Sequence, residues 1–149
     1  MKTFHSQSLE ETQKAAAEWL GEVSHKYKDQ DEALVAGLSG HLGAGKTAFV
    51  KMMAKLLGVK EEVTSPTFVI MKIYEVKNEN VRWKRLVHID AYRLESGREL
   101  EALNYEKIVA DTNNLVMIEW PENVGLKSFD EMAKLSFEIK EGVYVLNIV

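Results

Sequence analysis

The 149-residue sequence contains no cysteine, only two prolines and no long run of apolar residues. Without cysteine there is no disulfide framework, no thiolate chemistry and no cysteine-ligated metal. Apolar runs such as residues 115–118 fall far short of the ~20 residues that a membrane-spanning helix needs. The first residues, MKTFHSQSLEET, lack the apolar segment of a signal peptide. We therefore expect a cytoplasmic protein with no membrane association.

An excess of basic residues is missing too. The chain has 19 lysines and arginines against 23 aspartates and glutamates, which gives a formal net charge of −4. A domain dedicated to nucleic-acid binding usually carries a positive excess, so this charge argues against that class. Hydrophobic residues make up 46% of the sequence, enough to bury a core in a chain of this length. A single domain over residues 1–149 is expected.

The sequence does contain a regular succession of helical and strand-like segments. Ser8 and Glu11 have the spacing of a capping box and predict a helix over about residues 9–27. The apolar run ALVAGLSG, residues 33–40, is typical of a strand buried on both faces. Helical spacing of apolar residues then predicts a second helix over residues 46–57.

The second half of the chain predicts mainly strands. Two β-rich runs, residues 68–76 and 81–89, flank the polar turn KNEN and predict an antiparallel hairpin. Loop and short helices are expected over residues 91–111, and a buried strand over 113–120. Two further strands, 133–140 and 143–149, complete the prediction. The fold class is therefore α/β, a mostly parallel sheet flanked by helices with an antiparallel hairpin insertion.

The segment GHLGAGKT, residues 40–47, matches the pattern G-x-x-x-x-G-K-[ST] of a phosphate-binding loop. Glycines allow positive φ and let backbone N–H groups approach a phosphate closely. The following helix directs its N-terminal donors at the same anion. Lys46 can bridge the β- and γ-phosphates, and the Thr47 hydroxyl can ligate Mg²⁺. This motif, between a strand and a helix, predicts a P-loop NTPase-like domain that binds a nucleoside triphosphate.

Two acidic residues follow apolar runs and are candidate catalytic groups. Asp90 ends the run in HIDAYRL, and Glu119 ends the run in LVMIEW. Ligands of open α/β sheets gather at the carboxyl ends of the strands, where such acids can hold Mg²⁺ or orient a water. Because no N/T-K-x-D segment for guanine is present, ATP is the favoured nucleotide. The segment TSPT, residues 64–67, is either an ordinary turn or a hydroxyl-bearing loop that senses the γ-phosphate.

Taken together, the motifs GHLGAGKT, SPTF, HIDAYRL and IEWPE resemble those of the TsaE (YjeE) family in order and spacing. The resemblance spans residues 34–122. It implies a weak ATPase that uses ATP and Mg²⁺, with ADP as product, in making threonylcarbamoyladenosine at position 37 of tRNA. The implied partners are the proteins TsaB and TsaD, with tRNA reached indirectly through their complex. TsaD, not this family, transfers the threonylcarbamoyl group.

The resemblance also implies roles for individual residues. Lys46, Asp90 and Glu119 are the expected catalytic residues, and Thr47 and Glu119 the expected Mg²⁺ ligands. Trp120 is expected to be a functional aromatic residue beside the site. The expected nucleotide contacts are Thr12, near the adenine, and Gly43, Ala44, Gly45, Lys46, Thr47 and Ala48. The expected switch loop is Ser65, Pro66 and Thr67.

Two features leave alternatives open. His41 occupies a loop position where the family usually has Asp or Asn, and simple divergence is favoured there. Between residues 72 and 85 five basic residues stand against two acidic ones, with Tyr74 and Trp83 interleaved. This pattern fits either a solvated hairpin or a surface that touches tRNA or an acidic partner.

Three functions remain compatible with the motifs. The favoured one is the partner-dependent ATPase, because acids at strand ends and a candidate switch loop accompany the phosphate-binding loop. A small-molecule kinase would need an arginine-bearing lid, for which only residues 93–98 are available. A nucleotide-regulated binding module would bind ATP without relevant hydrolysis.

Overall fold

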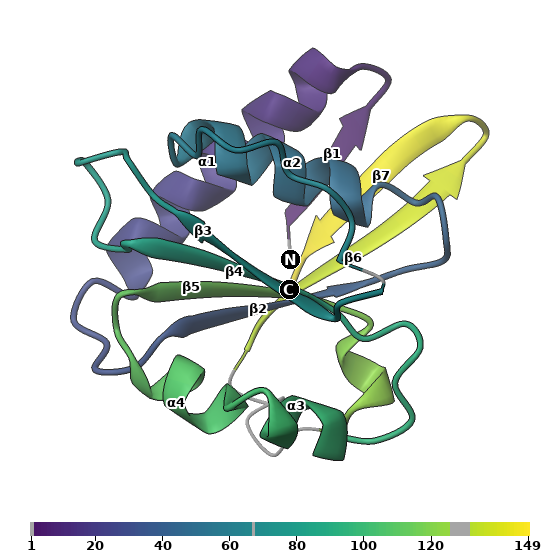
Figure 1. Cartoon of the computed structure of the whole chain (residues 1–149). Coiled ribbons are helices and arrows are strands. Elements are labelled where there is room, and N and C mark those ends of the chain that lie inside the picture. Colours follow the sequence, from purple (N-terminus) through teal and green to yellow (C-terminus); the bar gives the residue numbers. More distant parts are fainter. Residues whose placement is uncertain (1, 67, 126–131) are drawn as a thin grey trace.

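The structure is a computed structural model that describes residues 2–66, 68–125 and 132–149 (Figure 1). One sheet runs through the described residues, with helices on both of its faces. The strands are β1 (Lys2–Ser6), β2 (Leu34–Ser39), β3 (Met71–Glu75), β4 (Arg85–Asp90), β5 (Asn114–Glu119), β6 (Ala133–Lys140) and β7 (Val143–Ile148). The helices are α1 (Leu9–Lys26), α2 (Lys46–Leu56), α3 (Arg98–Ala102) and α4 (Tyr105–Ala110), with the 3-10 turn η1 (Pro121–Asn123).

The strand order is β1-β7-β6-β2-β5-β4-β3. The four central strands, β6, β2, β5 and β4, are parallel to one another. The outer pairings β1–β7, β7–β6 and β4–β3 are antiparallel. The expected α/β class is confirmed, but the sheet is mixed and its parallel part is confined to the centre. The difference arises from the β6–β7 hairpin and from β1, a strand that the sequence did not predict.

The two faces of the sheet bury different side chains of the same strands. Helices α1 and α2 cover one face, where Trp19, Phe49 and Leu115 belong to the larger core cluster. Helices α3 and α4 lie on the opposite face, where Val87 and Val116 belong to the second cluster (Figure 1). Since β2 and β5 are covered on both faces, their sequences are apolar almost throughout. None of the helices in the described residues is both long and apolar enough to span a bilayer.

Helix α1 starts where the sequence predicts. The Ser8 hydroxyl accepts a hydrogen bond from the backbone N–H of Glu11 at 3.2 Å. The Glu11 carboxylate accepts one from the backbone N–H of Gln7 at 2.5 Å, one residue earlier than in the standard capping box. The first turn of α1 is therefore fixed next to the end of β1, which places Thr12 beside Ser6, with their hydroxyl oxygens 2.8 Å apart.

The antiparallel hairpin forms as predicted, with Met71 opposite Ile89 at one end and Glu75 opposite Arg85 at the other. Its connection is longer than the predicted four-residue turn and covers residues 76–84. Trp83 is buried in the core, which pulls this segment inward. At the tip, the backbone N–H groups of Lys77 and Asn78 both donate to the carbonyl of Leu57, at 3.1 and 3.0 Å. The tip is thus tied to the end of α2.

Candidate functional site

The segment between β2 and α2 has the backbone that its glycines predict. Gly40, Gly43 and Gly45 all have positive φ, at 147°, 78° and 105°. A Cβ atom on Gly40 would lie 2.3 Å from the carbonyl oxygen of Phe137 in β6, closer than any side chain tolerates. Glycine at residue 40 therefore lets the loop pass directly against β6 before α2 begins at Lys46.

Lys46, the first residue of α2, is buried beneath this loop. Its ammonium group donates hydrogen bonds to the carbonyls of Gly40 and His41, the latter at 2.8 Å. The Nζ atom also lies 4.5 Å from the centre of the Trp120 ring. Burial lowers the pKa of Lys46, while the charges of Glu119, Glu122 and Asp90 oppose that shift. Two carbonyls of the loop and the Trp120 ring thus surround the ammonium group of Lys46. A cation in this position can bind a phosphate.

Glu119 is the centre of a buried polar cluster at the end of β5. The Thr47 hydroxyl lies 3.0 and 3.1 Å from its two carboxylate oxygens. On the other side, the Nε2 atom of His88 lies 2.6 Å from Oε2. Hydrogen bonds from a hydroxyl and an imidazole orient this carboxylate next to the start of α2. The sequence did not predict this contact of His88 with Glu119.

Asp90 lies beside Glu119 because β4 and β5 are parallel and in register, with Asp90 opposite Glu119. One Asp90 oxygen accepts a hydrogen bond from the backbone N–H of Tyr92 at 3.0 Å. The hydroxyl of Ser65 is 3.5 Å from the other oxygen. The segment predicted as a switch loop therefore meets the acid at the end of β4.

The predicted switch loop is described only in part. Ser65 lines a pocket that also includes Lys46 and Glu119, whereas Pro66 is buried and is not part of that lining. The carbonyl of Pro66 accepts backbone N–H bonds from Val69, at 3.1 Å, and Ile70. Thr67 lies outside the described residues.

Trp120 follows Glu119 in a left-handed conformation, with φ of 59°. This conformation is uncommon for a bulky residue. It turns the indole ring back over Lys46 and against Tyr92, whose ring centre is 5.2 Å away. The ring therefore connects Lys46 with the segment that follows Asp90.

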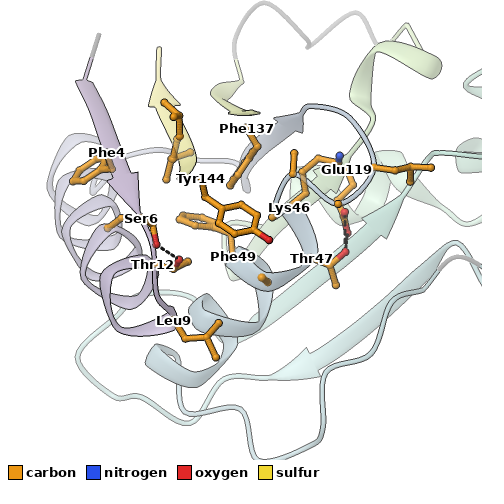
Figure 2. Close-up of a pocket in the computed structure, with 18 of the residues that line it drawn as sticks. Phe4, Ser6, Leu9, Thr12, Lys46, Thr47, Phe49, Glu119, Phe137 and Tyr144 are labelled. Carbon is orange, nitrogen blue, oxygen red and sulfur yellow. Dashed lines mark hydrogen bonds between the residues drawn. The ribbon is translucent and has the colours of Figure 1, made fainter. Parts of the chain in front are cut away.

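A pocket of about 620 Å³ joins these groups (Figure 2). Its polar end lies at the loop, at Thr47 and at Glu119, and its other end is bordered by side chains from β1, α1 and the C-terminal strands. Sequence reasoning did not find that second wall, since β1 was not predicted and the tail carried no motif. Of the predicted residues, the pocket lining includes Thr12, Gly43, Ala44, Gly45, Lys46, Thr47, Ala48, Ser65, Asp90, Glu119 and Trp120. The residues that the sequence missed include Phe4, Phe137 and Tyr144.

His41 does not belong to the pocket lining. Its side chain is exposed, and its backbone carbonyl makes the contact with Lys46. Because any residue supplies that carbonyl, the structure agrees with divergence at a tolerant position.

Two arginines of the basic segment 72–85 make contacts with other parts of the chain. The guanidinium of Arg82 bonds to Thr112 and to the carbonyl of Gln30, at 3.3 Å, and Arg85 pairs with Asp111 at 2.5 Å. Both aromatic residues of the segment are buried, so neither offers a ring for stacking on a nucleic-acid base. The solvated-hairpin interpretation is therefore favoured.

The cluster around Thr47 and Glu119 suits Mg²⁺ in the chemistry of its donors. A hydroxyl oxygen and a carboxylate are hard ligands of the kind that this ion takes. No group of three His, Asp or Glu side chains within the described residues is placed to hold a metal ion. An ion here would take its other oxygen ligands from water or from a phosphate group, as for a metal that arrives with a nucleotide.

The sequence profile described as "Threonylcarbamoyl adenosine biosynthesis protein TsaE" matches residues 6–144. The chain belongs to the TsaE family. Curated relatives named tRNA threonylcarbamoyladenosine biosynthesis protein TsaE come from Borreliella burgdorferi, Streptomyces coelicolor and Treponema pallidum. They are 36, 42 and 39% identical over 103, 86 and 94 residues. These alignments cover 68, 57 and 63% of this chain and 71, 55 and 64% of the relatives.

A solved structure supports the fold of this TsaE-family chain. The crystal structure of Bacillus subtilis YdiB superimposes with a TM-score of 0.63, covering 99% of this chain and 83% of that one. The two sequences are 22% identical, so the likeness concerns the fold alone. The family places the chain in tRNA threonylcarbamoyladenosine biosynthesis, as the sequence resemblance predicted.

Proposed function

We propose that this TsaE-family chain binds ATP with Mg²⁺ and hydrolyses it slowly to ADP and phosphate. It acts on a TsaB–TsaD complex during formation of threonylcarbamoyladenosine at position 37 of tRNA, and it does not transfer the group itself. The observation that carries the proposal is the contact of Thr47 with Glu119 beside a glycine loop whose lysine is buried. Cytoplasmic location, inferred from the sequence, belongs to the same proposal.

Each group of residues in the pocket has a separate role in this proposal. Backbone N–H groups of the loop and of the first turn of α2 bind the phosphates, and Lys46 exchanges its carbonyl partners for phosphate oxygens. Thr47 and Glu119 would hold Mg²⁺, which would supply positive charge to neutralise the phosphate oxygens. Asp90, at the adjacent strand end, orients the attacking water. Ser65 bonds to Asp90 and so couples the proposed switch loop to that water.

The far end of the pocket suits the base. Phe4, Leu9, Phe137 and Tyr144 offer apolar surface there, and the hydroxyls of Ser6 and Thr12 provide polar contacts (Figure 2). A flat heteroaromatic ring gains by burial against such walls. This arrangement supports Thr12 as a residue beside the adenine.

The test is phosphate release from ATP by the purified chain, alone and with TsaB and TsaD, in comparison with Lys46→Ala and Glu119→Ala. We expect both variants to lose at least about 100-fold in rate. Lys46→Ala removes a positive charge at the phosphates, and Glu119→Ala removes a proposed ligand of the Mg²⁺ that would stabilise their charge in the transition state. Lys51→Ala is the matched control, since Lys51 is an exposed lysine of the same helix.

The outcomes separate the three candidate functions. Release that rises with the partners and collapses in both variants supports the proposal. Tight ATP binding without release favours a nucleotide-regulated module, and a phosphorylated small molecule would establish a kinase. Release that ignores TsaB and TsaD contradicts the partner assignment.

A further inference from the structure

His88 is a fully buried polar side chain with no part in the mechanism proposed above. It lies on β4 two residues before Asp90, so both side chains point to the face of the sheet that α1 and α2 cover. A histidine between the buried residues Val87 and Ile89 gives up hydration, and such a position needs a compensating contact.

The compensating contact is made by one ring nitrogen only. Nε2 lies 2.6 Å from Oε2 of Glu119, whereas Nδ1 has no hydrogen-bond partner among the described residues. A neutral imidazole that carries its proton on Nε2 fits this geometry, because it donates to Glu119 and leaves only a lone pair at Nδ1. An imidazolium would bury a second N–H group without an acceptor.

The carboxylate of Glu119 is thereby held from two sides. The Thr47 hydroxyl contacts it from the start of α2, and His88 contacts it from the core. Each donor occupies part of the carboxylate's lone-pair positions, so together they restrict its rotation. Glu119 is also part of the pocket lining, so the carboxylate held in this way borders the pocket.

We propose that His88 is a positioning residue that fixes the orientation of Glu119 for the metal ion. The assignment rests on the proposed function, in which Glu119 helps to hold Mg²⁺ with the nucleotide. Groups that orient a metal-binding carboxylate by hydrogen bonding typically affect metal affinity by about 10- to 100-fold. His88 itself touches neither metal nor nucleotide and acts through Glu119.

Two substitutions separate positioning from simple packing. In His88→Gln the amide nitrogen lies the same number of bonds from the backbone as Nε2 of histidine, so the donor to Glu119 is kept. His88→Leu keeps an apolar side chain of comparable size without a donor. Should His88→Leu fail to fold, His88→Asn replaces it, because its amide is one bond too short to reach Glu119.

The measurement is Mg²⁺ affinity at saturating ADP, by calorimetry, together with ADP affinity without metal. We expect His88→Leu to weaken Mg²⁺ binding about 10- to 100-fold and to leave metal-free ADP affinity within about 3-fold. His88→Gln is expected to recover most of the loss. In a Glu119→Ala background, His88→Leu is expected to have no further effect on the metal.

Other results overturn the assignment. If His88→Gln and His88→Leu weaken Mg²⁺ and metal-free ADP binding equally, His88 only supports packing. If His88→Leu leaves Mg²⁺ affinity unchanged while the unsubstituted chain binds Mg²⁺ and ADP, this assignment alone fails. If the unsubstituted chain binds neither, the proposed function fails and the assignment with it.

Discussion

At the scale of single residues, burial lowers the pKa of Lys46. Its ammonium group contacts two carbonyls and an aromatic ring, and the charges of Glu119, Glu122 and Asp90 act on it. Desolvation is the main cause of its lowered pKa. The folded chain therefore binds this proton less tightly than the unfolded chain. Lys46 ionisation opposes folding below its folded-state pKa, and this penalty disappears as the pH rises past 10.5, the ordinary value.

The same shift predicts a pH dependence of ATP binding. Phosphate oxygens favour the charged ammonium, so binding raises the pKa of Lys46 and takes up a proton at pH values between the free and bound pKa. We expect ATP affinity to fall, and proton uptake to grow, as the pH rises towards 10.5 through the lowered pKa of free Lys46. Calorimetry in two buffers of different ionisation enthalpy measures both quantities. Flat affinity with no uptake over this range would contradict the burial of a charged Lys46.

At the scale of elements, two glycines with different surroundings predict opposite effects of alanine. Gly40 has positive φ and would place its Cβ 2.3 Å from the carbonyl of Phe137, which forces the loop away from β6. We expect Gly40→Ala to lower the free energy of unfolding by about 3 kcal/mol and to disturb the proposed phosphate site. Urea unfolding of the chain, followed by circular dichroism, measures this effect.

Gly21 provides the matched control for that experiment. It is an exposed residue inside α1, and nothing lies within 4 Å of the Cβ that alanine would add. We expect Gly21→Ala to raise the free energy of unfolding by about 0.5–1 kcal/mol, because alanine is the better helix former. Equal effects of the two substitutions would mean that the contact between the loop and β6 is absent.

At the scale of the whole molecule, the pocket joins segments from both ends of the chain. A ligand that binds only the folded state raises stability by mass action, about 2.7 kcal/mol at 100 times its dissociation constant. For a chain of this size we expect ATP with Mg²⁺ to raise Tm by roughly 5–10 °C. Tyr144→Ala is expected to reduce this shift, because Tyr144 borders the end of the pocket assigned to the base.

Ile139 offers a control on the same hairpin. It lies directly opposite Tyr144 in the β6–β7 register, is similarly exposed, and is outside the pocket lining. Thermal melts with and without nucleotide should show the full shift in Ile139→Ala. An unchanged shift in Tyr144→Ala would remove the C-terminal strands from the nucleotide site.

The sequence predicted much of this arrangement for reasons that are local. The glycines at 40, 43 and 45 need positive φ, and the apolar runs before Asp90 and Glu119 form the buried strands that carry these acids. The capping pair Ser8 and Glu11 set the start of α1. Such features depend on a few neighbouring residues, so they can be inferred without the fold.

Contacts between distant segments could not be predicted from the sequence in the same way. β1 is a short N-terminal strand that pairs with β7 at the other end of the chain, and its five residues carry no distinctive pattern. The connection between β3 and β4 is longer than the four-residue turn that the sequence predicts. Trp83 is buried in the core, and the hairpin tip is hydrogen-bonded to the carbonyl of Leu57.

The sequence by itself determined the loop, the lysine and the two acids, because their chemistry requires those residue types at that spacing. Only the tertiary structure decided what surrounds them. The parallel register of β4 and β5 brought His88 and Asp90 to Glu119, and the sheet order brought β1 and β7 to the far wall of the pocket. Strand pairing between distant segments depends on the global burial of apolar surface, which no single motif encodes.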